Sequence, residues 1–280
     1  MIYPFSFSFD ENFIEAAIVS FTSVLLNADP KKKYELNIFH DAIPKNQLEV
    51  FHDLCSSYSN FSIVTHDISS RVANGYEKRG ISKVAYSRLY IPTILAHHDK
   101  VLHLDVDLVV NCDISEIFNL IDSDKTVLGR KKISLKKRYA KKYNFKDLYI
   151  NDGVCLYNIK KFTSQQKQQM VDLISAKKDT FLVQHIINFV LRDTIDYSLD
   201  PTYNFTNEIY RYLKKNKEKI KGIYSDEFIN DFKSPKIIHY TGKKPWNTRV
   251  NFSEYWWYYY RRSPIYDFSY FEKFIDFKNK

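Results

Sequence analysis

Two carboxylates separated by one residue interrupt an apolar stretch near the middle of the chain. Asp105 and Asp107 flank Val106, and the residues before and after them, 101–104 and 108–110, are mostly apolar. Carboxylates are rarely buried in a core unless a positive charge pairs with them. At the end of a strand, the two aspartates could share one divalent cation through oxygen ligands. The alternative is that they cap a loop or pair with a nearby lysine or arginine.

A second segment, residues 237–246, could complete such a site. An apolar strand is expected to end at His239. Its imidazole could fill another position around the cation, although a hydrogen-bonded core histidine is the alternative. Gly242 would allow close approach of the backbone, and Lys244 could neutralise a phosphate as a point charge. Trp246 is better explained by packing than by stacking on a ligand.

The segments around these residues predict an α/β fold. Strands are expected at 2–9, 34–40, 61–64, 101–104, 108–110 and 150–159, and helices at 13–26, 44–58, 81–95, 161–176, 181–192 and 208–221. Strands that alternate with helices indicate a parallel sheet with right-handed crossovers. Ligands gather at the carboxyl ends of such strands, which is where Asp105 and Asp107 would lie. Pro92 is expected to bend or end the helix at 81–95.

Several motifs occur in the order typical of one enzyme family. They are Phe-Asp-Glu-Asn-Phe at 9–13, Tyr-x-Arg-Leu at 86–89, Asp-x-Asp at 105–107, Asn-x-Gly-Val at 151–154, the segment 184–188, His-x-x-Gly with Lys-Pro-Trp within 239–246, and the aromatic tail at 255–264. With them the chain resembles glycosyltransferase family 8, whose retaining enzymes have the GT-A fold and include bacterial lipopolysaccharide galactosyl- and glucosyltransferases.

The resemblance implies a domain organisation. We expect an α/β GT-A fold, with a Rossmann-like, mainly parallel sheet flanked by helices and a small helical appendage at the C-terminus. The catalytic domain would span residues 1–250, and an aromatic and basic extension would span residues 251–280.

The resemblance also implies which residues bind the donor and the metal. Asp105 would bridge the ribose and a cation, while Asp107 and His239 would ligate the cation directly. One imidazole among oxygen ligands favours Mn²⁺, with Mg²⁺ as the alternative. Asp10 and Asn12 would hydrogen-bond the uracil. The full expected set for the UDP-sugar is Asp10, Asn12, Arg88, Asp105, Val106, Asn151, Gly242 and Lys244.

Near the sugar the sequence departs from the family pattern. Val183 and His185 flank a retained Gln184 where the family usually has Asp, and Asp152 stands where a small residue is usual. The expected catalytic residues are Gln184, Asp152 and Lys244. We expect Asp152 to orient donor hydroxyls rather than act as a nucleophile, because the acceptor would attack the sugar from the face that UDP leaves. Gly242 and Lys244 are one residue closer together than in the commonest spacing, which affects only loop geometry.

The charge of the chain points to anionic partners. The 280 residues carry a net charge of +9, and a basic surface favours phosphorylated ligands or an anionic membrane. Residues 130–146 hold nine lysines and arginines. This stretch could be a solvated helix face, or it could contact a phosphorylated acceptor or a membrane. No RNA-binding motif accompanies it, so nucleic acid is not an expected partner.

The expected activity is the Mn²⁺-dependent transfer of glucose or galactose from UDP-glucose or UDP-galactose to a bacterial surface glycan. The acceptor would be a glycan or glycolipid like lipopolysaccharide or lipooligosaccharide. Alternatives are another UDP-sugar with a capsule or glycoprotein acceptor, a degenerate non-catalytic protein that binds membrane or RNA, and a metal-dependent phosphohydrolase. The first 13 residues have no basic region or cleavage site typical of a signal peptide.

The three cysteines, Cys55, Cys112 and Cys155, lie far apart. Their spacing argues against a zinc ribbon or a disulfide framework and suits a reducing compartment. We therefore expect a cytoplasmic protein, with a peripheral position on the cytoplasmic face of the inner membrane as a further alternative.

Overall fold

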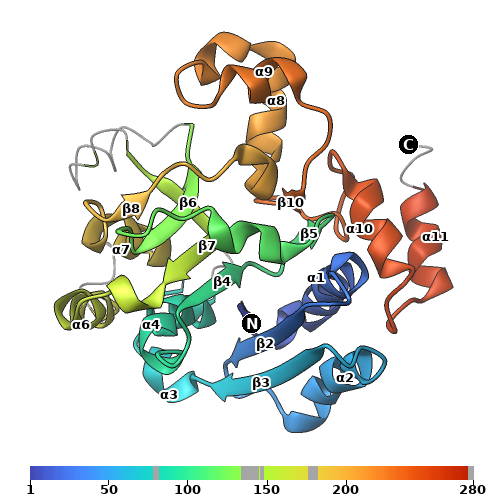
Figure 1. Cartoon of the computed structure of the whole chain (residues 1–280). Coiled ribbons are helices and arrows are strands. Elements are labelled where there is room, and N and C mark those ends of the chain that lie inside the picture. The colour runs from blue at the N-terminus through green and yellow to red at the C-terminus, as the bar shows by residue number, and fades with distance from the viewer. Residues whose placement is uncertain (78–81, 134–144, 146–147, 176–181, 277–280) are drawn as a thin grey trace.

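A seven-stranded sheet forms the centre of the molecule (Figure 1). The computed structural model describes residues 1–77, 82–133, 145, 148–175 and 182–276. The strands of the sheet are β1 (Ile2–Phe9), β2 (Lys33–His40), β3 (Phe61–Asp67), β4 (Lys100–Leu104), β6 (Val127–Lys131), β7 (Ile150–Asn158) and β8 (Ile195–Asp196). They lie in the order β3-β2-β1-β4-β7-β6-β8. β7 runs antiparallel to β4 and β6, and the other neighbours are parallel. The predicted mainly parallel sheet is confirmed.

Helices cover both faces of this sheet (Figure 1). Up to β8 they are η1 (Glu11–Phe13), α1 (Ile14–Asn27), α2 (Lys45–Ser56), α3 (Ser69–Val72), η2 (Lys83–Leu89), α4 (Ile91–Ile94), η3 (Ile114–Asn119), η4 (Ile159–Lys161), α6 (Ser164–Asp172) and α7 (Val183–Val190). Side chains along β1 point alternately to the two faces of the sheet. On one face, Phe5, Phe7 and Phe9 share a hydrophobic core with Phe21 of α1 and Phe51 of α2. The opposite face packs against η2, α6 and α7.

A second, three-stranded sheet brings distant segments together beside the first. It has the order β5-β10-β9, formed by β5 (Leu108–Val110), β10 (Ile237–His239) and β9 (Phe205–Thr206). Between β8 and β10 the chain also forms η5 (Pro201–Asn204), α8 (Asn207–Lys215), η6 (Lys217–Ile220) and α9 (Asp226–Asp231). Antiparallel pairing places His239 opposite Leu108. This register carries the histidine to within one residue of Asp107, which precedes Leu108.

The C-terminal segment forms two helices, α10 (Ser253–Tyr260), which lies beside α1, and α11 (Phe268–Asp276), which packs on α10 (Figure 1). Trp256, whose side chain is buried, packs its ring 5.3 Å from those of both Trp246 and Tyr260. This aromatic cluster also contains Val19 of α1 and Val109 of β5. Many of the aromatic residues in the tail therefore fill a core. In the described residues, no helix is long and apolar enough to cross a membrane.

Two predicted helices were wrong in extent. Instead of one helix over 81–95, the described part forms the 3-10 helix η2 and then the short α4. Pro92 lies in the first turn of α4, where its missing N–H costs nothing, so it begins a helix rather than bending one. The helix expected at 208–221 ends at Lys215, because Asn216 leaves the helical conformation with a φ of −161°. Strands β6, β8 and β9 were not predicted.

Candidate active site

The two aspartates of the Asp-x-Asp motif follow the carboxyl end of β4, as predicted. Two backbone hydrogen bonds fix the loop that carries them. The N–H of Asp105 donates to the carbonyl of Gly153 in β7 at 2.8 Å, and the N–H of Tyr240 donates to the carbonyl of Asp107 at 2.8 Å. Val106 between them is buried at 6% exposure. The loop is therefore tied to the large sheet on one side and to the small sheet on the other.

The carboxylates of Asp105 and Asp107 meet the imidazole of His239. The Nε2 atom of His239 lies 3.1 Å from Oδ1 of Asp107 and 3.5 Å from Oδ2 of Asp105. One ligand atom from each of the three residues lies within 4.8 Å of the others. Two carboxylates and one imidazole form a donor set that suits a divalent transition metal such as Mn²⁺.

Gly153 leaves the space that this cluster occupies. A Cβ atom at position 153 would lie 2.2 Å from Cε1 of His239 and 2.5 Å from Oδ2 of Asp105. Both separations are far below van der Waals contact, so any side chain here would displace the imidazole or the carboxylate. The glycine of the Asn-x-Gly-Val motif is thus required by the metal-type cluster rather than by its own backbone conformation.

A chain of hydrogen bonds orients the imidazole of His239. The N–H of Gly153 donates to Oδ1 of Asn151 at 3.2 Å, and this same oxygen accepts from Nδ2 of Asn204 at 2.8 Å. Oδ1 of Asn204 then accepts from Nδ1 of His239 at 2.9 Å. Because Nδ1 of His239 donates its proton in this series of hydrogen bonds, the lone pair of the neutral imidazole is on Nε2, which points to Asp107. Asn204, which is fully buried, was missed from the sequence.

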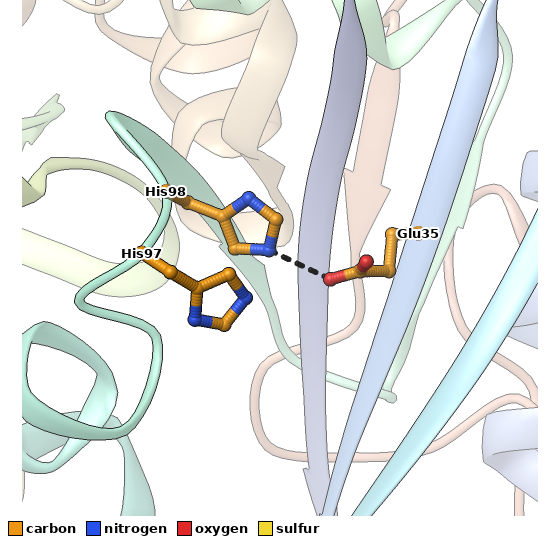
Figure 2. Close-up of side chains that lie close together, drawn as sticks. All are labelled: Glu35, His97 and His98. Atoms are coloured by element: carbon orange, nitrogen blue, oxygen red, sulfur yellow. Dashed lines mark hydrogen bonds and ion pairs between the residues drawn. The ribbon is translucent and has the colours of Figure 1, made fainter.

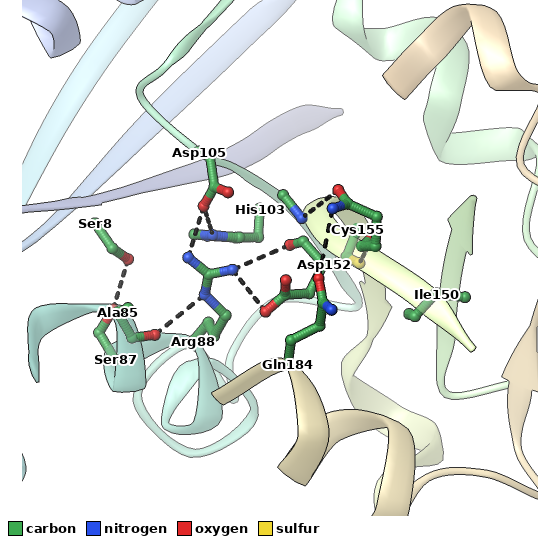
Figure 3. Close-up of polar contacts among 12 residues, drawn as sticks. Ser8, Ala85, Ser87, Arg88, His103, Asp105, Ile150, Asp152, Cys155 and Gln184 are labelled. Atoms are coloured by element: carbon green, nitrogen blue, oxygen red, sulfur yellow. Dashed lines mark hydrogen bonds and ion pairs between the residues drawn. The ribbon is translucent and has the colours of Figure 1, made fainter. Parts of the chain in front are cut away.

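Arg88 of η2 lies between two carboxylates, as Figure 3 shows. Its Nη2 donates to Oδ1 of Asp105 at 2.6 Å and its Nη1 donates to Oδ2 of Asp152 at 2.7 Å. Burial opposes the charge on Asp105, but Arg88 and the two neighbouring histidines together outweigh this effect and lower the pKa of the Asp105 carboxyl well below its usual range. Burial raises the pKa of Asp152, and nearby Asp105 adds to the rise. As pH falls, Asp152 is therefore protonated before Asp105.

Lys244 forms an ion pair with Asp107 and donates to the carbonyl of Tyr240 at 3.0 Å. The lysine thus lies at the cluster, next to a predicted metal ligand. Gly242, in the turn between Tyr240 and Lys244, has a φ of 86°, a conformation that favours glycine. A Cβ at Gly242 would meet no atom within 4 Å. Glycine is therefore favoured at position 242 by its backbone conformation and not by a lack of space for a side chain.

Gln184 and Asn151 meet at the edge of the cluster that faces α7. Nδ2 of Asn151 donates to Oε1 of Gln184 at 3.4 Å, and Nε2 of Gln184 donates to the hydroxyl of Tyr149 at 3.0 Å. Asp152 is next to Asn151 on β7 and pairs with Arg88. Figure 3 shows the amide of Gln184 and the carboxylate of Asp152 beside each other, near Arg88.

The uracil contacts expected for Asp10 and Asn12 lie outside this network. Asp10 follows β1, the strand next to β4, and its Oδ1 accepts from the N–H of Asn12 at 3.0 Å. The side chain of Asn12 is exposed. Both residues are at the same end of the strands as Asp105, but within the described residues no hydrogen bond or ion pair joins them to it. This placement is consistent with a nucleoside that extends away from the metal-type cluster.

The basic stretch at 130–146 lies largely outside the described residues. Arg130, which belongs to it, is buried at 1% exposure and donates to the hydroxyl of Tyr224 at 2.8 Å. This arginine packs in the interior, so it cannot contribute to an exposed basic surface. The sequence pattern alone did not separate Arg130 from its neighbours because strand β6, which buries it, was not predicted.

Comparisons with known proteins give one consistent result. A family model described as "Glycosyl transferase family 8" matches residues 4–249. "Glycosyltransferase GlyE" of Streptococcus pneumoniae is 30% identical over 188 residues, which cover 64% of this chain and 41% of that protein. "Glycosyltransferase GlyD" of the same organism is 27% identical, over 66% of this chain and 22% of its own length. The matched segments thus span less than half the length of these relatives.

Solved structures share the fold over almost the whole chain. A crystal structure of an active-site mutant of LgtC has a TM-score of 0.78 and 22% identity, and the match covers 96% of this chain and 99% of that one. The WbbM bifunctional glycosyltransferase has a TM-score of 0.74 and 23% identity, and the match covers 100% of this chain and 52% of that one. At these identities the likeness shows a common fold.

Proposed function

The chain belongs to glycosyltransferase family 8, and from this premise we propose that it transfers glucose or galactose from UDP-glucose or UDP-galactose to a bacterial surface glycan, with retention of the anomeric configuration. The observation that carries the proposal is the cluster of Asp105, Asp107 and His239 at the carboxyl ends of the strands. A degenerate, non-catalytic protein would have no need of three convergent ligands and an asparagine that orients one of them.

Three residues would hold the divalent cation of this reaction, which we infer to be Mn²⁺ with Mg²⁺ as the alternative. The site fits such an ion, since Nε2 of His239 carries its lone pair toward the carboxylates and Gly153 leaves room beside them. When bound, the cation would supply positive charge to the diphosphate as UDP leaves. Imidazole is a poor ligand for Mg²⁺, which takes oxygen ligands in octahedral geometry. The donor set therefore favours Mn²⁺.

Arg88 and Lys244 are the cations of this chain that would contact the donor. Arg88 is held in place by Asp105 and Asp152, so its guanidinium would be preorganised before the donor binds. Lys244, which pairs with Asp107 here, would turn to a phosphate oxygen once Asp107 is engaged as a ligand. Asp10, Asn12, Asn151, Val106 and Gly242 would line the remainder of the donor site.

The residues next to the sugar favour attack from the face that UDP leaves. Double displacement would need a carboxylate about 3 Å from the anomeric carbon. Gln184 is an amide and a poor nucleophile. Asp152 is a carboxylate, but its Oδ2 is held 2.7 Å from Nη1 of Arg88. We infer that Asp152 orients the donor through Arg88 and that Gln184 steadies the charge that develops on the sugar.

A pocket of about 390 Å³ borders His239 and fits the acceptor part of the proposal. Lys243 and Arg249, both exposed, are among its lining residues. They would favour an acceptor that carries phosphate or carboxylate groups. A lipopolysaccharide-like or lipooligosaccharide-like acceptor matches this chemistry. A capsule or glycoprotein acceptor with another UDP-sugar is the second candidate, because the pocket selects charge rather than a particular sugar.

The same proposal places the enzyme in the cytoplasm, at the anionic face of a membrane. Four exposed residues of the C-terminal segment support it: Tyr258 and Phe268 are apolar anchors, and Arg261 and Arg262 are cations. Aromatic residues favour the membrane interface, and each cation near an anionic surface adds about 1 kcal/mol. The wild type and a variant lacking residues 261–280 are compared in co-sedimentation with anionic vesicles. Equal binding of the two would refute the proposed position at the membrane.

Donor hydrolysis tests the function directly. The purified chain is incubated with Mn²⁺ and, separately, with UDP-glucose, UDP-galactose and their N-acetyl forms, and released UDP is measured. We expect release from one hexose donor, dependent on Mn²⁺ and lost in Asp107→Asn. Release of inorganic phosphate from these nucleotides without any sugar acceptor would favour a phosphohydrolase instead. Equal turnover by wild type and Asp107→Asn would refute the site.

A further inference from the structure

A second group of side chains that could bind a metal lies near the amino ends of the strands, at the opposite end of the sheet from the active site. Glu35 is near the amino end of β2, and His97 and His98 precede β4. Each of the three offers one ligand atom, and these atoms lie within 4.8 Å of one another. Figure 2 shows both imidazoles on the side of the strand from which the Glu35 carboxylate projects. The Asp-x-Asp motif, by contrast, follows the carboxyl end of β4.

The carboxylate of Glu35 is held in place by its neighbours. Oε1 accepts from Nδ2 of Asn37 at 2.9 Å and from Nε2 of His98 at 2.7 Å. Oδ1 of Asn37, which is buried, accepts in turn from Nε2 of His66 at 2.9 Å. Hydrogen-bonded carboxylates of this kind are a usual feature of metal sites. Both recorded hydrogen bonds of Glu35 end on Oε1, so Oε2 has no donor among the described residues.

An ordinary ion pair between Glu35 and His98 does not explain why the ring of His97 lies beside them. Glu35 and His98, both half-buried, already pair with each other without it. His97 is exposed and has no hydrogen bond to any described residue, yet its ring centroid is 4.1 Å from that of His98. The N–H of His98 donates to the carbonyl of Leu95 at 3.1 Å, which fixes the turn that presents both rings.

We propose that Glu35, His97 and His98 form a second metal site, with Zn²⁺ as the ion. Two imidazoles and one carboxylate, with a position left for water, form a donor set that zinc takes up in proteins. Mg²⁺ and Ca²⁺ prefer oxygen ligands and would bind this set poorly. A tetrahedral ion with bonds of about 2.0–2.1 Å holds its ligands roughly 3.4 Å apart. On binding, the proton between Nε2 of His98 and Oε1 of Glu35 would leave to solvent, and these atoms, now 2.7 Å apart, would separate to admit the ion. Rotation of the exposed His97 side chain would bring in the third ligand.

The bound ion would tie the turn before β4 to β2. Its ligands come from segments more than 60 residues apart in sequence, as the numbering of Glu35 and His97 shows. A link of this kind stabilises the folded chain, because the ligands are held together only in the folded state. The site would be structural in its effect and separate from sugar transfer.

Zn²⁺ titration by calorimetry tests the proposal. Asp107→Ala is the background, because it removes a ligand of the active-site cluster. We expect one Zn²⁺ per chain in this variant and at least a tenfold loss of affinity when His97→Ala is added. His98→Ala is not the first choice, since it also breaks the bond to Glu35. His52→Ala, which removes an exposed histidine of α2, is the matched control and should leave the affinity unchanged.

Two outcomes would overturn the proposal: no Zn²⁺ bound in the Asp107→Ala background, or the same affinity with and without His97. Should Asp107→Ala fail to fold, the comparison is made in the wild-type background, where His97→Ala is expected to lower the number of Zn²⁺ ions from two to one. An unchanged number there would count against the site in the same way. Mg²⁺ added at equal concentration should not compete.

Discussion

Oδ1 of Asn204 accepts a hydrogen bond from Nδ1 of His239 at 2.9 Å, across 35 residues of sequence. This contact decides which nitrogen of the imidazole faces the carboxylates. Asn204 ends the short helix η5, next to β9, and the pairing of β9 with β10 brings it to the histidine. The asparagine is a positioning residue, since it acts on the metal-type cluster only through His239.

Asn204→Ala should therefore weaken metal binding without unfolding the chain. Loss of an outer partner of a metal ligand usually costs about 10–100-fold in affinity. We expect this loss for Mn²⁺ in isothermal titration, with donor hydrolysis recovering at high Mn²⁺. Asn216→Ala, at an exposed position after α8, is the matched control. Identical Mn²⁺ affinities for the wild type and Asn204→Ala would show that the bond to Asn204 does not position His239.

Gly153→Ala tests the packing of the cluster. The added methyl would lie 2.2 Å from Cε1 of His239, and overpacking of this kind typically costs about 1–3 kcal/mol. We expect loss of Mn²⁺-dependent UDP binding together with a lower free energy of unfolding. Gly222→Ala separates the two effects, because it enters open space with a φ of 73°. It should cost about 1–2 kcal/mol through backbone strain alone and keep UDP binding. If Gly153→Ala binds UDP as the wild type does, the cluster does not depend on the space left at position 153.

Asp152→Asn addresses the roles near the sugar. The substitution removes one of the two negative charges that hold Arg88, so donor placement should change more than chemistry. We expect a raised KM or an altered donor preference with kcat within about tenfold of wild type, a barrier change of about 1.4 kcal/mol. Steady-state kinetics on each UDP-sugar measures this. A glycosyl adduct trapped on Asp152, or a kcat lower by several orders of magnitude, would make it the nucleophile.

Much of this arrangement could be predicted from local sequence. β1 has its predicted bounds, and Asp105 and Asp107 follow the carboxyl end of β4 as expected. His239 and Lys244 meet them because β10 pairs with β5, the strand directly after Asp107. Asn204 could not be predicted in this way. Its role depends on the pairing of β9 with β10, and a strand of two residues such as β9 has no periodicity to detect.

Arg130 was misplaced for a related reason. A lysine- and arginine-rich run is usually a solvated surface, and only the burial of β6 between β7 and β8 turns this one arginine inward. The tail shows the same limit, since aromatic residues favour a membrane interface and a protein core alike. Trp256 is buried in the cluster with Val19 and Val109, and contacts of this kind are set by tertiary packing.

Asp113 gives a prediction about stability and pH. Its carboxylate accepts from Lys32, Tyr34 and Ser115. Burial alone would raise the pKa of Asp113, but these hydrogen bonds outweigh burial and lower it. A carboxyl with a lowered pKa in the folded state stabilises the protein above its unfolded pKa of about 3.9, and this contribution is lost as pH falls through the folded value.

Asp113→Asn should accordingly lower the free energy of unfolding by about 1–2 kcal/mol at neutral pH. The difference from wild type should begin to shrink below about pH 4, where the carboxyl of the unfolded wild type becomes protonated, and should go on shrinking as pH falls through the lowered pKa of the folded state. Urea unfolding at both pH values measures this. Asp53→Asn, at an exposed position of α2, is the control and should change little. A difference that is constant with pH would mean that the charge of Asp113 contributes nothing.

The central claim, a UDP-sugar site built on a cation held by Asp105, Asp107 and His239, is tested most directly by thermal unfolding with UDP. At a UDP concentration about 100 times its Kd, a ligand that binds only the folded state adds about 2.7 kcal/mol. We predict stabilisation of this size when UDP and Mn²⁺ are both present, little with UDP alone, and none in Asp107→Ala. Equal stabilisation by UDP with and without Mn²⁺, or in Asp107→Ala, would contradict the account.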